Sequence, residues 1–269
     1  MMVTKVPSRS FGNINLTLQM TINTKQDKFI LGTYLLPDGR MVFSGGIFVN
    51  GTIIVLNANG SLSFEVHLPS SSFDVTYITE GNTLAVSSGG SSAQCIYIID
   101  MENRKVKKTI SVNDRIYGIK YNGTGLIHCG HTGIRMIDPN DETIRDIVRG
   151  KILSECYVTA YGDKLYHTNL NKNTVTCYDI KGNKKWAFEN KIILQAPAGI
   201  SVDNDGNIYV VGRKSNSLIM ISPDGKRHRQ LLSAKDGLSE PWSIHFSMER
   251  NMLIVANSRG GKAFLYSVN

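Results

Sequence analysis

The chain has 269 residues, of which 41% are hydrophobic and 19% are charged, so a globular protein has ample material for a core. Thirty Lys and Arg residues against 22 Asp and Glu residues give a formal charge of +8, which favours anionic partners. No apolar run approaches the roughly 18 residues that span a bilayer. The opening residues lack the continuous apolar segment of a secretion signal, so we expect a cytoplasmic protein that does not insert into membranes.

The first predicted element is a strand at residues 14–22, INLTLQMTI, in which apolar and polar residues alternate. A pattern then begins and recurs to the end of the chain: a β-rich run, a short polar loop, and a second β-rich run that ends in a polar turn residue. The second runs end at Asn57, Asp100, Asp138, Asp179, Ser222 and Ser267, at intervals of 43, 38, 41, 43 and 45 residues. Six copies at this period predict a repeat protein.

Each copy has a further strand upstream, and the first five copies add an outer strand downstream. Four antiparallel strands in 40–45 residues are typical of a propeller blade. We therefore predict an all-β fold, a single six-bladed β-propeller over residues 1–269, with blades near 28–68, 73–110, 115–149, 155–189, 196–233 and 241–268. The sixth copy lacks its outer strand, so we expect residues 14–22 to pair into the last blade and close the ring.

The fifth copy, PAGISVDNDGNIYVVGRKSNSLIMISPDG at residues 197–225, resembles an NHL repeat. The first copy keeps LPDGRMVFSGG, and the last keeps PWSIHFS followed by MLIVANS, so the chain is similar to the C-terminal propellers of tripartite-motif (TRIM) proteins. In that family the propeller recruits substrates or binds RNA, whereas ubiquitin transfer belongs to a RING domain. The resemblance implies a recognition module of the ubiquitin pathway, with a protein or RNA partner and a RING-containing ligase as parent or partner.

In a propeller, the loops between the second and third strands of a blade share one face with the loops that join blades. On this face we place eleven cations and five anions, and the residues predicted to bind a partner are Arg115, Tyr117, Arg149, Lys151, Lys172, Arg213, Lys214, Trp242, Arg259 and Lys262. The remaining cations are Lys25, Lys28 and Lys235, and the anions are Asp27, Asp114, Glu155, Asp236 and Glu240. Aromatic rings among cations could stack on bases or hold a peptide. Solvated loops also carry lysine, and Trp242 could instead plug the mouth of the channel, so both interpretations stay open.

Most other carboxylates fall in hairpin turns on the opposite face, where we expect them to cap turns: Asp38, Glu80, Asp138, Asp141, Asp163, Asp205 and Asp224. The densest basic run, DGKRHRQ at residues 224–230, also lies in a hairpin there. We expect its charged side chains to protect a solvated edge strand from pairing with another chain.

The alternative to a recognition module is a metal-dependent propeller hydrolase or lyase with its site at the channel mouth. His128, His131 and His167 lie near one rim and form a weak candidate zinc site, although strand alternation should point His128 and His131 apart. The chain has no nucleophile elbow, phosphate loop or HExxH motif. We therefore expect no catalytic residue, no cofactor and no enzymatic activity. The four cysteines, at positions 95, 129, 156 and 177, are scattered and form no CxxC pair, so we expect them to be reduced residues of the core.

Overall fold

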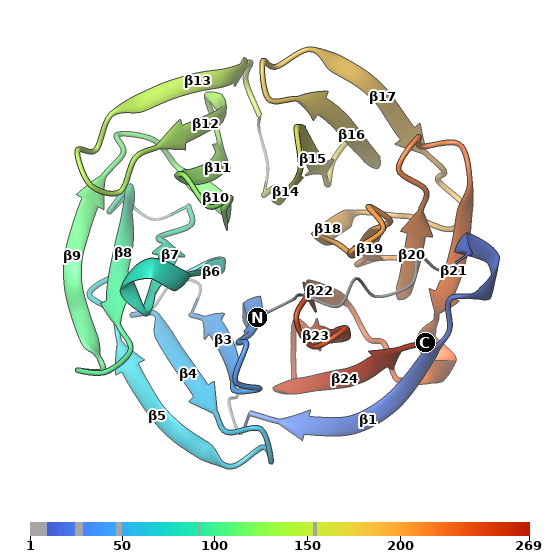
Figure 1. The fold of residues 1–269 in the computed structure, drawn as a ribbon, viewed down its shortest axis with the longest axis horizontal. Helices are drawn as coiled ribbons and strands as arrows, with labels where there is room; N and C mark the ends of the chain where they lie inside the picture. Colours follow the sequence, from blue (N-terminus) through green and yellow to red (C-terminus); the bar gives the residue numbers. More distant parts are fainter. Residues whose placement is uncertain (1–9, 25–28, 47–49, 91, 153–154) are drawn as a thin grey trace, which may run out of the picture.

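A computed structural model describes residues 10–24, 29–46, 50–90, 92–152 and 155–269 of the chain. Its strands form six four-stranded antiparallel sheets, which stand around a central axis as the blades of a propeller (Figure 1). The described residues contain three 3₁₀ turns, η1 (Phe11–Asn13), η2 (Thr79–Gly81) and η3 (Ala234–Asp236), and no helix long enough to cross a membrane. The predicted all-β, six-bladed architecture is confirmed.

The blades follow one another in chain order, each running from the channel outward. Blades 1 and 2 contain β2 (Ile30–Leu35), β3 (Met41–Gly45), β4 (Thr52–Leu56), β5 (Leu62–His67), β6 (Val75–Ile78), β7 (Thr83–Ser87), β8 (Cys95–Asp100) and β9 (Lys105–Ser111). Blades 3 and 4 contain β10 (Ile116–Tyr121), β11 (Leu126–Gly130), β12 (Gly133–Ile137), β13 (Ile144–Arg149), β14 (Val158–Tyr161), β15 (Lys164–Asn169), β16 (Thr174–Asp179) and β17 (Lys184–Glu189). Blades 5 and 6 contain β18 (Pro197–Val202), β19 (Ile208–Gly212), β20 (Ser217–Ile221), β21 (His228–Leu232), β22 (Pro241–Ser247), β23 (Met252–Asn257), β24 (Lys262–Val268) and the N-terminal β1 (Leu16–Asn23).

The ring is closed by the N-terminal strand, as the missing outer strand of the sixth copy predicted. β1 pairs antiparallel with β24, from Leu16 opposite Val268 to Asn23 opposite Lys262, and lies along the outside of blade 6 (Figure 1). Asn15 and Asn269 exchange two backbone hydrogen bonds just beyond the strand ends. The edge of β24 is therefore fully paired, and residues from both ends of the chain build one sheet.

Burial along each strand follows its position in the blade. The middle strands pack between two neighbouring blades, so β4 and β7 are buried at every position. Outer strands have one solvated side, and β5 alternates between buried and exposed residues in the way a half-buried strand does. Apolar side chains from adjacent blades therefore form clusters between the sheets.

Three glycines let the innermost strands approach one another. Gly32, Gly118 and Gly199 lie in alternate blades, and a Cβ at any of them would come within 2.6–2.9 Å of a Cα in the next blade. Because such contacts are shorter than real Cβ atoms make, these positions need glycine. The inner strands are then joined by buried side chains: the His245 ring accepts from the Leu35 amide at 3.1 Å, and the Ser201 hydroxyl accepts from the Phe246 amide at 2.9 Å.

Candidate binding face on the loop side

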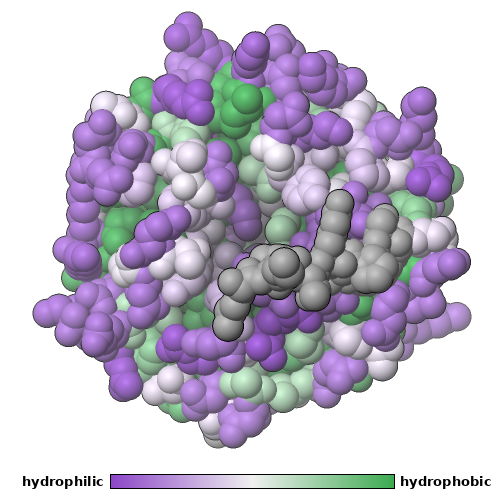
Figure 2. Space-filling model, viewed as in Figure 1, coloured by the Kyte–Doolittle hydropathy of each residue, from purple (hydrophilic) through white to green (hydrophobic). Residues whose placement is uncertain are grey.

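The loop face consists of the connections between second and third strands and between consecutive blades; the hairpin face carries the other turns. The hairpin face, with η2 in front, points toward the viewer in Figures 1 and 2. Figure 2 shows hydrophilic residues mainly around the outer rim of this face. The predicted binding residues lie on the loop face or on strand ends beside it. Lys25, Asp27 and Lys28 lie outside the described residues.

Most cations of the loop face are exposed and form no ion pair within the described parts of the chain. Three of them belong to blades 4, 5 and 6 and three to connections between blades: Lys172, Lys214, Lys262, Arg115, Lys151 and Lys235. Arg149 differs, because its guanidinium pairs with the Asp146 carboxylate at 2.9 Å at the end of β13. The six unpaired cations are free to meet an anionic partner.

Two arginines of this face lie over aromatic rings. The Arg213 guanidinium lies 4.5 Å from the centroid of the Trp242 ring, and that of Arg259 lies 5.4 Å from the centroid of Phe29. Both arginines approach the same Glu240 carboxylate oxygen, at 3.6 and 3.8 Å, beyond direct hydrogen-bond distance. Two guanidinium groups thus share one carboxylate, and the cluster keeps a net positive charge.

Two other loop-face carboxylates, those of Asp114 and Asp236, are occupied by local contacts. Asp114 is buried, and its carboxylate accepts from the Thr132 hydroxyl and the Thr132 amide, which fixes the loop between β11 and β12. Asp236 accepts from the Ser233 amide in a capping box that begins η3. These carboxylates hold loops in place and leave the neighbouring cations without a counter-ion.

The two aromatic residues predicted to bind a ligand are both buried. Tyr117 is 7% exposed and Trp242 is 6% exposed. The Tyr117 ring meets Phe73 edge-on at 5.3 Å, and burial raises the pKa of its phenol to about 12. Trp242 is covered by Arg213. Neither ring offers the open face that base stacking needs, so the accessible chemistry of the loop face is cationic.

The central channel is blocked by Tyr157. This side chain precedes β14 in blade 4, and its hydroxyl donates to the Leu31 carbonyl in blade 1, on the opposite side of the ring. Phe73 packs against it at 5.1 Å between ring centroids. What remains of the channel toward the hairpin side is a cavity of about 20 Å³. That volume holds roughly one water molecule, far less than the several hundred Å³ of a small-molecule pocket.

Polar groups line this small cavity. Asp74 accepts from the Val75 and Ile119 amides, at 2.9 and 3.0 Å, and burial raises the pKa of its carboxyl to about 7. Burial lowers the pKa of the Lys120 ammonium, which lies 5.7 Å from the centroid of the Tyr34 ring. The His245 ring stacks on Tyr34 with centroids 3.8 Å apart. These contacts join blades around the channel.

The three histidines of the candidate zinc site do not come together. His128 is 1% exposed, and burial lowers its pKa to about 4, so it stays neutral inside blade 3. His131 is half-buried, with its Nε2 3.4 Å from the Tyr117 hydroxyl. His167 instead lies beside two cysteines, Cys129 and Cys156. The spacing of the histidines along the sequence gave no sign of that grouping, because it is formed between two blades.

On the hairpin face, carboxylates cap turns as expected at Asp38, Asp138, Asp141 and Asp224. In the turn that contains Asp205, the Asp203 carboxylate accepts from the Asp205 amide at 2.9 Å. The basic run at 224–230 is not simply solvated: the Arg229 guanidinium donates to the Gly12 carbonyl and to Asn15 Oδ1, and Arg227 lies over the Phe11 ring. This run therefore helps to hold the segment that leads into β1.

Comparison with known proteins gives structural likeness alone. No family model matches the sequence, and no curated protein is similar to it. Among solved structures, a Bacteroides thetaiotaomicron protein of unknown function has a TM-score of 0.76 at 12% identity, over 95% of this chain and 76% of that one. Virginiamycin B lyase from Staphylococcus aureus, solved with quinupristin, has a TM-score of 0.67 at 16% identity, over 94% of this chain and 99% of that one.

The β-propeller domain of Cps50 (Swd1) from Myceliophthora thermophila also has a TM-score of 0.67, at 12% identity, over 94% of this chain and 100% of that one. A protein of unknown function, a lyase and a propeller domain thus share one architecture at low identity. Such likeness carries no activity or ligand from one protein to another. It agrees with the sheet topology on one point: this chain is a six-bladed β-propeller.

Proposed function

We propose that the chain is a recognition module that binds an acidic protein segment on its loop face. The observation that carries this proposal is the set of exposed loop-face cations without ion pairs, beside carboxylates that are occupied by Thr132 and Ser233. Surface charge of one sign attracts and orients a partner of the other sign. The resemblance to TRIM propellers, which recruit substrates, supports the same role.

A protein segment is favoured over RNA because the two aromatic side chains of the loop face are buried. Recognition of single-stranded RNA relies on bases that stack on open rings, and both Tyr117 and Trp242 are buried. An acidic peptide needs only cations and hydrogen-bond donors, which the exposed lysines and arginines supply. RNA binding through phosphates alone is the competing outcome, and the experiment below separates the two.

The test measures fluorescence anisotropy of two labelled probes, a Glu- and Asp-rich peptide and a mixed-sequence single-stranded RNA, against the purified chain. We expect the peptide to bind, and we expect the double variant Lys172→Glu with Lys214→Glu to weaken that binding at least about 10-fold. The matched control is Lys105→Glu with Lys107→Glu, which makes the same change of charge on exposed positions of β9, away from the loop face. It should leave the affinity close to that of the parent chain.

Three results would count against the proposal. If neither probe binds at low salt, the loop face is not an anion-binding surface. If only the RNA binds, with an affinity that falls steeply as salt rises, the partner is a nucleic acid and the protein branch fails. A loss of peptide binding as large in the β9 control would show that net charge, and not the loop face, is responsible.

A further inference from the structure

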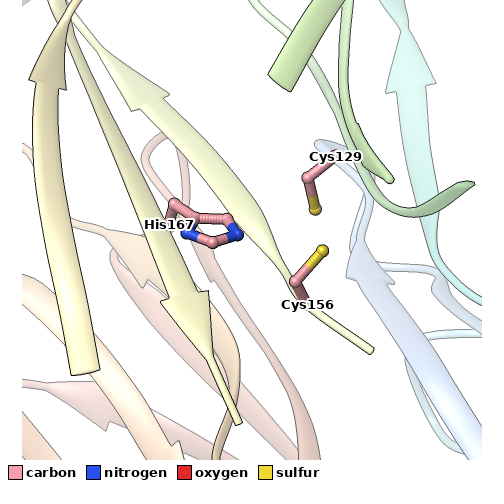
Figure 3. Close-up of side chains that lie close together, drawn as sticks. All are labelled: Cys129, Cys156 and His167. Carbon is pink, nitrogen blue, oxygen red and sulfur yellow. The ribbon is translucent and has the colours of Figure 1, made fainter. Parts of the chain in front are cut away.

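Two cysteines and a histidine converge at the interface between blades 3 and 4. Cys129 lies on β11, Cys156 lies just before β14, and His167 lies on β15. One ligand atom from each lies within 4.8 Å of the other two. Figure 3 shows the two sulfur atoms facing each other and one nitrogen of the imidazole ring turned toward them. The three side chains are 0%, 0% and 5% exposed.

The backbone around these residues is held by hydrogen bonds from both blades. The Gly118 amide donates to the Cys156 carbonyl at 2.9 Å, which joins blade 3 to blade 4. His167 is in register with Val158 across the β14–β15 ladder, and the Tyr157 amide next to Cys156 donates to the Thr168 hydroxyl at 3.0 Å. The three ligand-bearing positions are therefore placed by paired strands, and only small side-chain movements separate them.

Apolar packing accounts for the cysteines but not for the histidine. A buried thiol behaves as a small hydrophobic group, and the Cys129 thiol makes a weak contact with the Gly118 carbonyl at 3.8 Å. His167 Nε2, however, is buried without a hydrogen-bond partner among the described residues. A buried polar atom in that state is costly, and most such atoms in folded proteins have a partner. An imidazole nitrogen beside two sulfurs has the chemistry of a metal ligand.

We propose that Cys129, Cys156 and His167 bind a zinc ion that joins blade 3 to blade 4. Zinc takes thiolate and imidazole ligands at about 2.3 and 2.0 Å in tetrahedral geometry, which places the ligand atoms roughly 3.5–3.8 Å apart. Because the ligand atoms lie within 4.8 Å of one another, a contraction of at most about 1.3 Å is enough, and a water molecule completes the fourth position, as it does in zinc sites with three protein ligands.

Charge balance explains why this ion suits a buried interface. Burial, and then the neighbouring Cys129 thiol, raise the pKa of the Cys156 thiol, and burial lowers the pKa of His167 to about 4. The Cys156 thiol and the His167 ring are thus neutral without metal. Zinc binds cysteine as the thiolate, so metal binding displaces thiol protons to solvent. Two thiolates and one Zn²⁺ sum to zero, so the occupied site leaves no net charge in the interface.

The test is a titration of the reduced full chain with Co²⁺ under anaerobic conditions, followed by displacement with Zn²⁺. Cobalt reports the site because a sulfur-to-cobalt charge-transfer band appears when thiolates bind the ion. We expect one equivalent of Co²⁺ to saturate this band, and one equivalent of Zn²⁺ to remove it and to raise the melting temperature. Cys129→Ala and Cys156→Ala should abolish the band, whereas Cys177→Ala, at another buried cysteine outside the cluster, should keep it.

Several results would overturn the inference. The first is that the folded parent protein, with its thiols reduced, shows no sulfur-to-cobalt band. This result is decisive even if the alanine variants unfold, because it is obtained without any variant. A band that survives in Cys129→Ala, or is lost in Cys177→Ala, would place the metal elsewhere. A disulfide between residues 129 and 156 in freshly prepared protein would assign the pair to structural cross-linking. Binding of Cu⁺ without binding of Co²⁺ or Zn²⁺ would also refute a zinc site.

Discussion

The two faces of the ring carry their charged residues in different ways. On the hairpin face, carboxylates such as Asp100 and Asp179 accept hydrogen bonds from amides in their own turns, at 2.8–3.0 Å. These bonds and, for Asp179, the ion pair with Lys185 hold the pKa of both carboxyls below the usual value. On the loop face, Arg115 and five lysines extend from the loops and strand ends and form no ion pair with any residue that the structure describes. Charge on the hairpin face therefore shapes the fold, whereas charge on the loop face is available to a partner.

Opening the ring should be the strongest perturbation, because the two faces are separate surfaces only while the ring is closed. Deletion of residues 1–24 removes β1, exposes the edge of β24 and takes away the buried Ile14 and Ile22 side chains. We expect the melting temperature to fall by about 10 °C or more, or cooperative unfolding to be lost, as followed by circular dichroism. Deletion of residues 1–9 alone retains η1 and β1 and serves as the control. An unchanged transition after the longer deletion would contradict closure by this strand.

Breaking the best-connected turn of the hairpin face should have the next largest effect. The buried Asp203 carboxylate accepts from the Asn207 amide and side chain at 2.8 and 2.9 Å, and from the Tyr209 hydroxyl at 3.0 Å. Asp203→Ala leaves these donors buried without an acceptor and should lower the free energy of unfolding by about 3 kcal/mol, as measured in urea. Asp141→Ala, in an exposed turn, should have a much smaller effect. Equal losses in the two variants would show that burial does not distinguish these turns.

The sequence could predict this face well because turn chemistry is local. The D-G-N residues at 205–207 indicate one hairpin turn directly. In all six copies, a strand that ends in a polar residue indicates where the next turn begins, so a few neighbouring residues are enough to predict it. The loop-face site was harder to predict, since its properties depend on neighbouring blades. The burial of Tyr117 against Phe73, and the contact of Arg213 with the Trp242 ring, join residues from different blades. The grouping of Cys129 with His167 likewise follows from how two sheets pack, which no local pattern encodes.

Between the faces, the channel contains one carboxyl whose ionisation should oppose folding. Its pKa is about 3.8 in an unfolded chain and about 7 in the folded one. Between these values the folded state keeps a proton that the unfolded state releases, so Asp74 should lower stability progressively as the pH rises from about 4 to about 7. Asp74→Asn keeps an oxygen acceptor for the Ile119 amide and should remove this decline from urea unfolding curves measured at both pH values. A variant whose stability still declines in parallel with the parent chain would assign the effect to another group.

The smallest expected effect separates two adjacent cations of the loop face. Arg213 lies over the Trp242 ring, and Arg213→Gln should lower the free energy of unfolding by about 0.5–1 kcal/mol, the usual range for a cation stacked on an aromatic face. Lys214 is exposed and has no ion pair, so Lys214→Gln should leave the unfolding curve unchanged while weakening the binding of an acidic peptide. If Lys214→Gln destabilised the fold as much as Arg213→Gln, the loop-face cations would belong to the scaffold, and the contrast between the two faces would not hold. If stability and binding separate as expected, Arg213 stabilises the fold through Trp242, whereas Lys214 serves the partner alone.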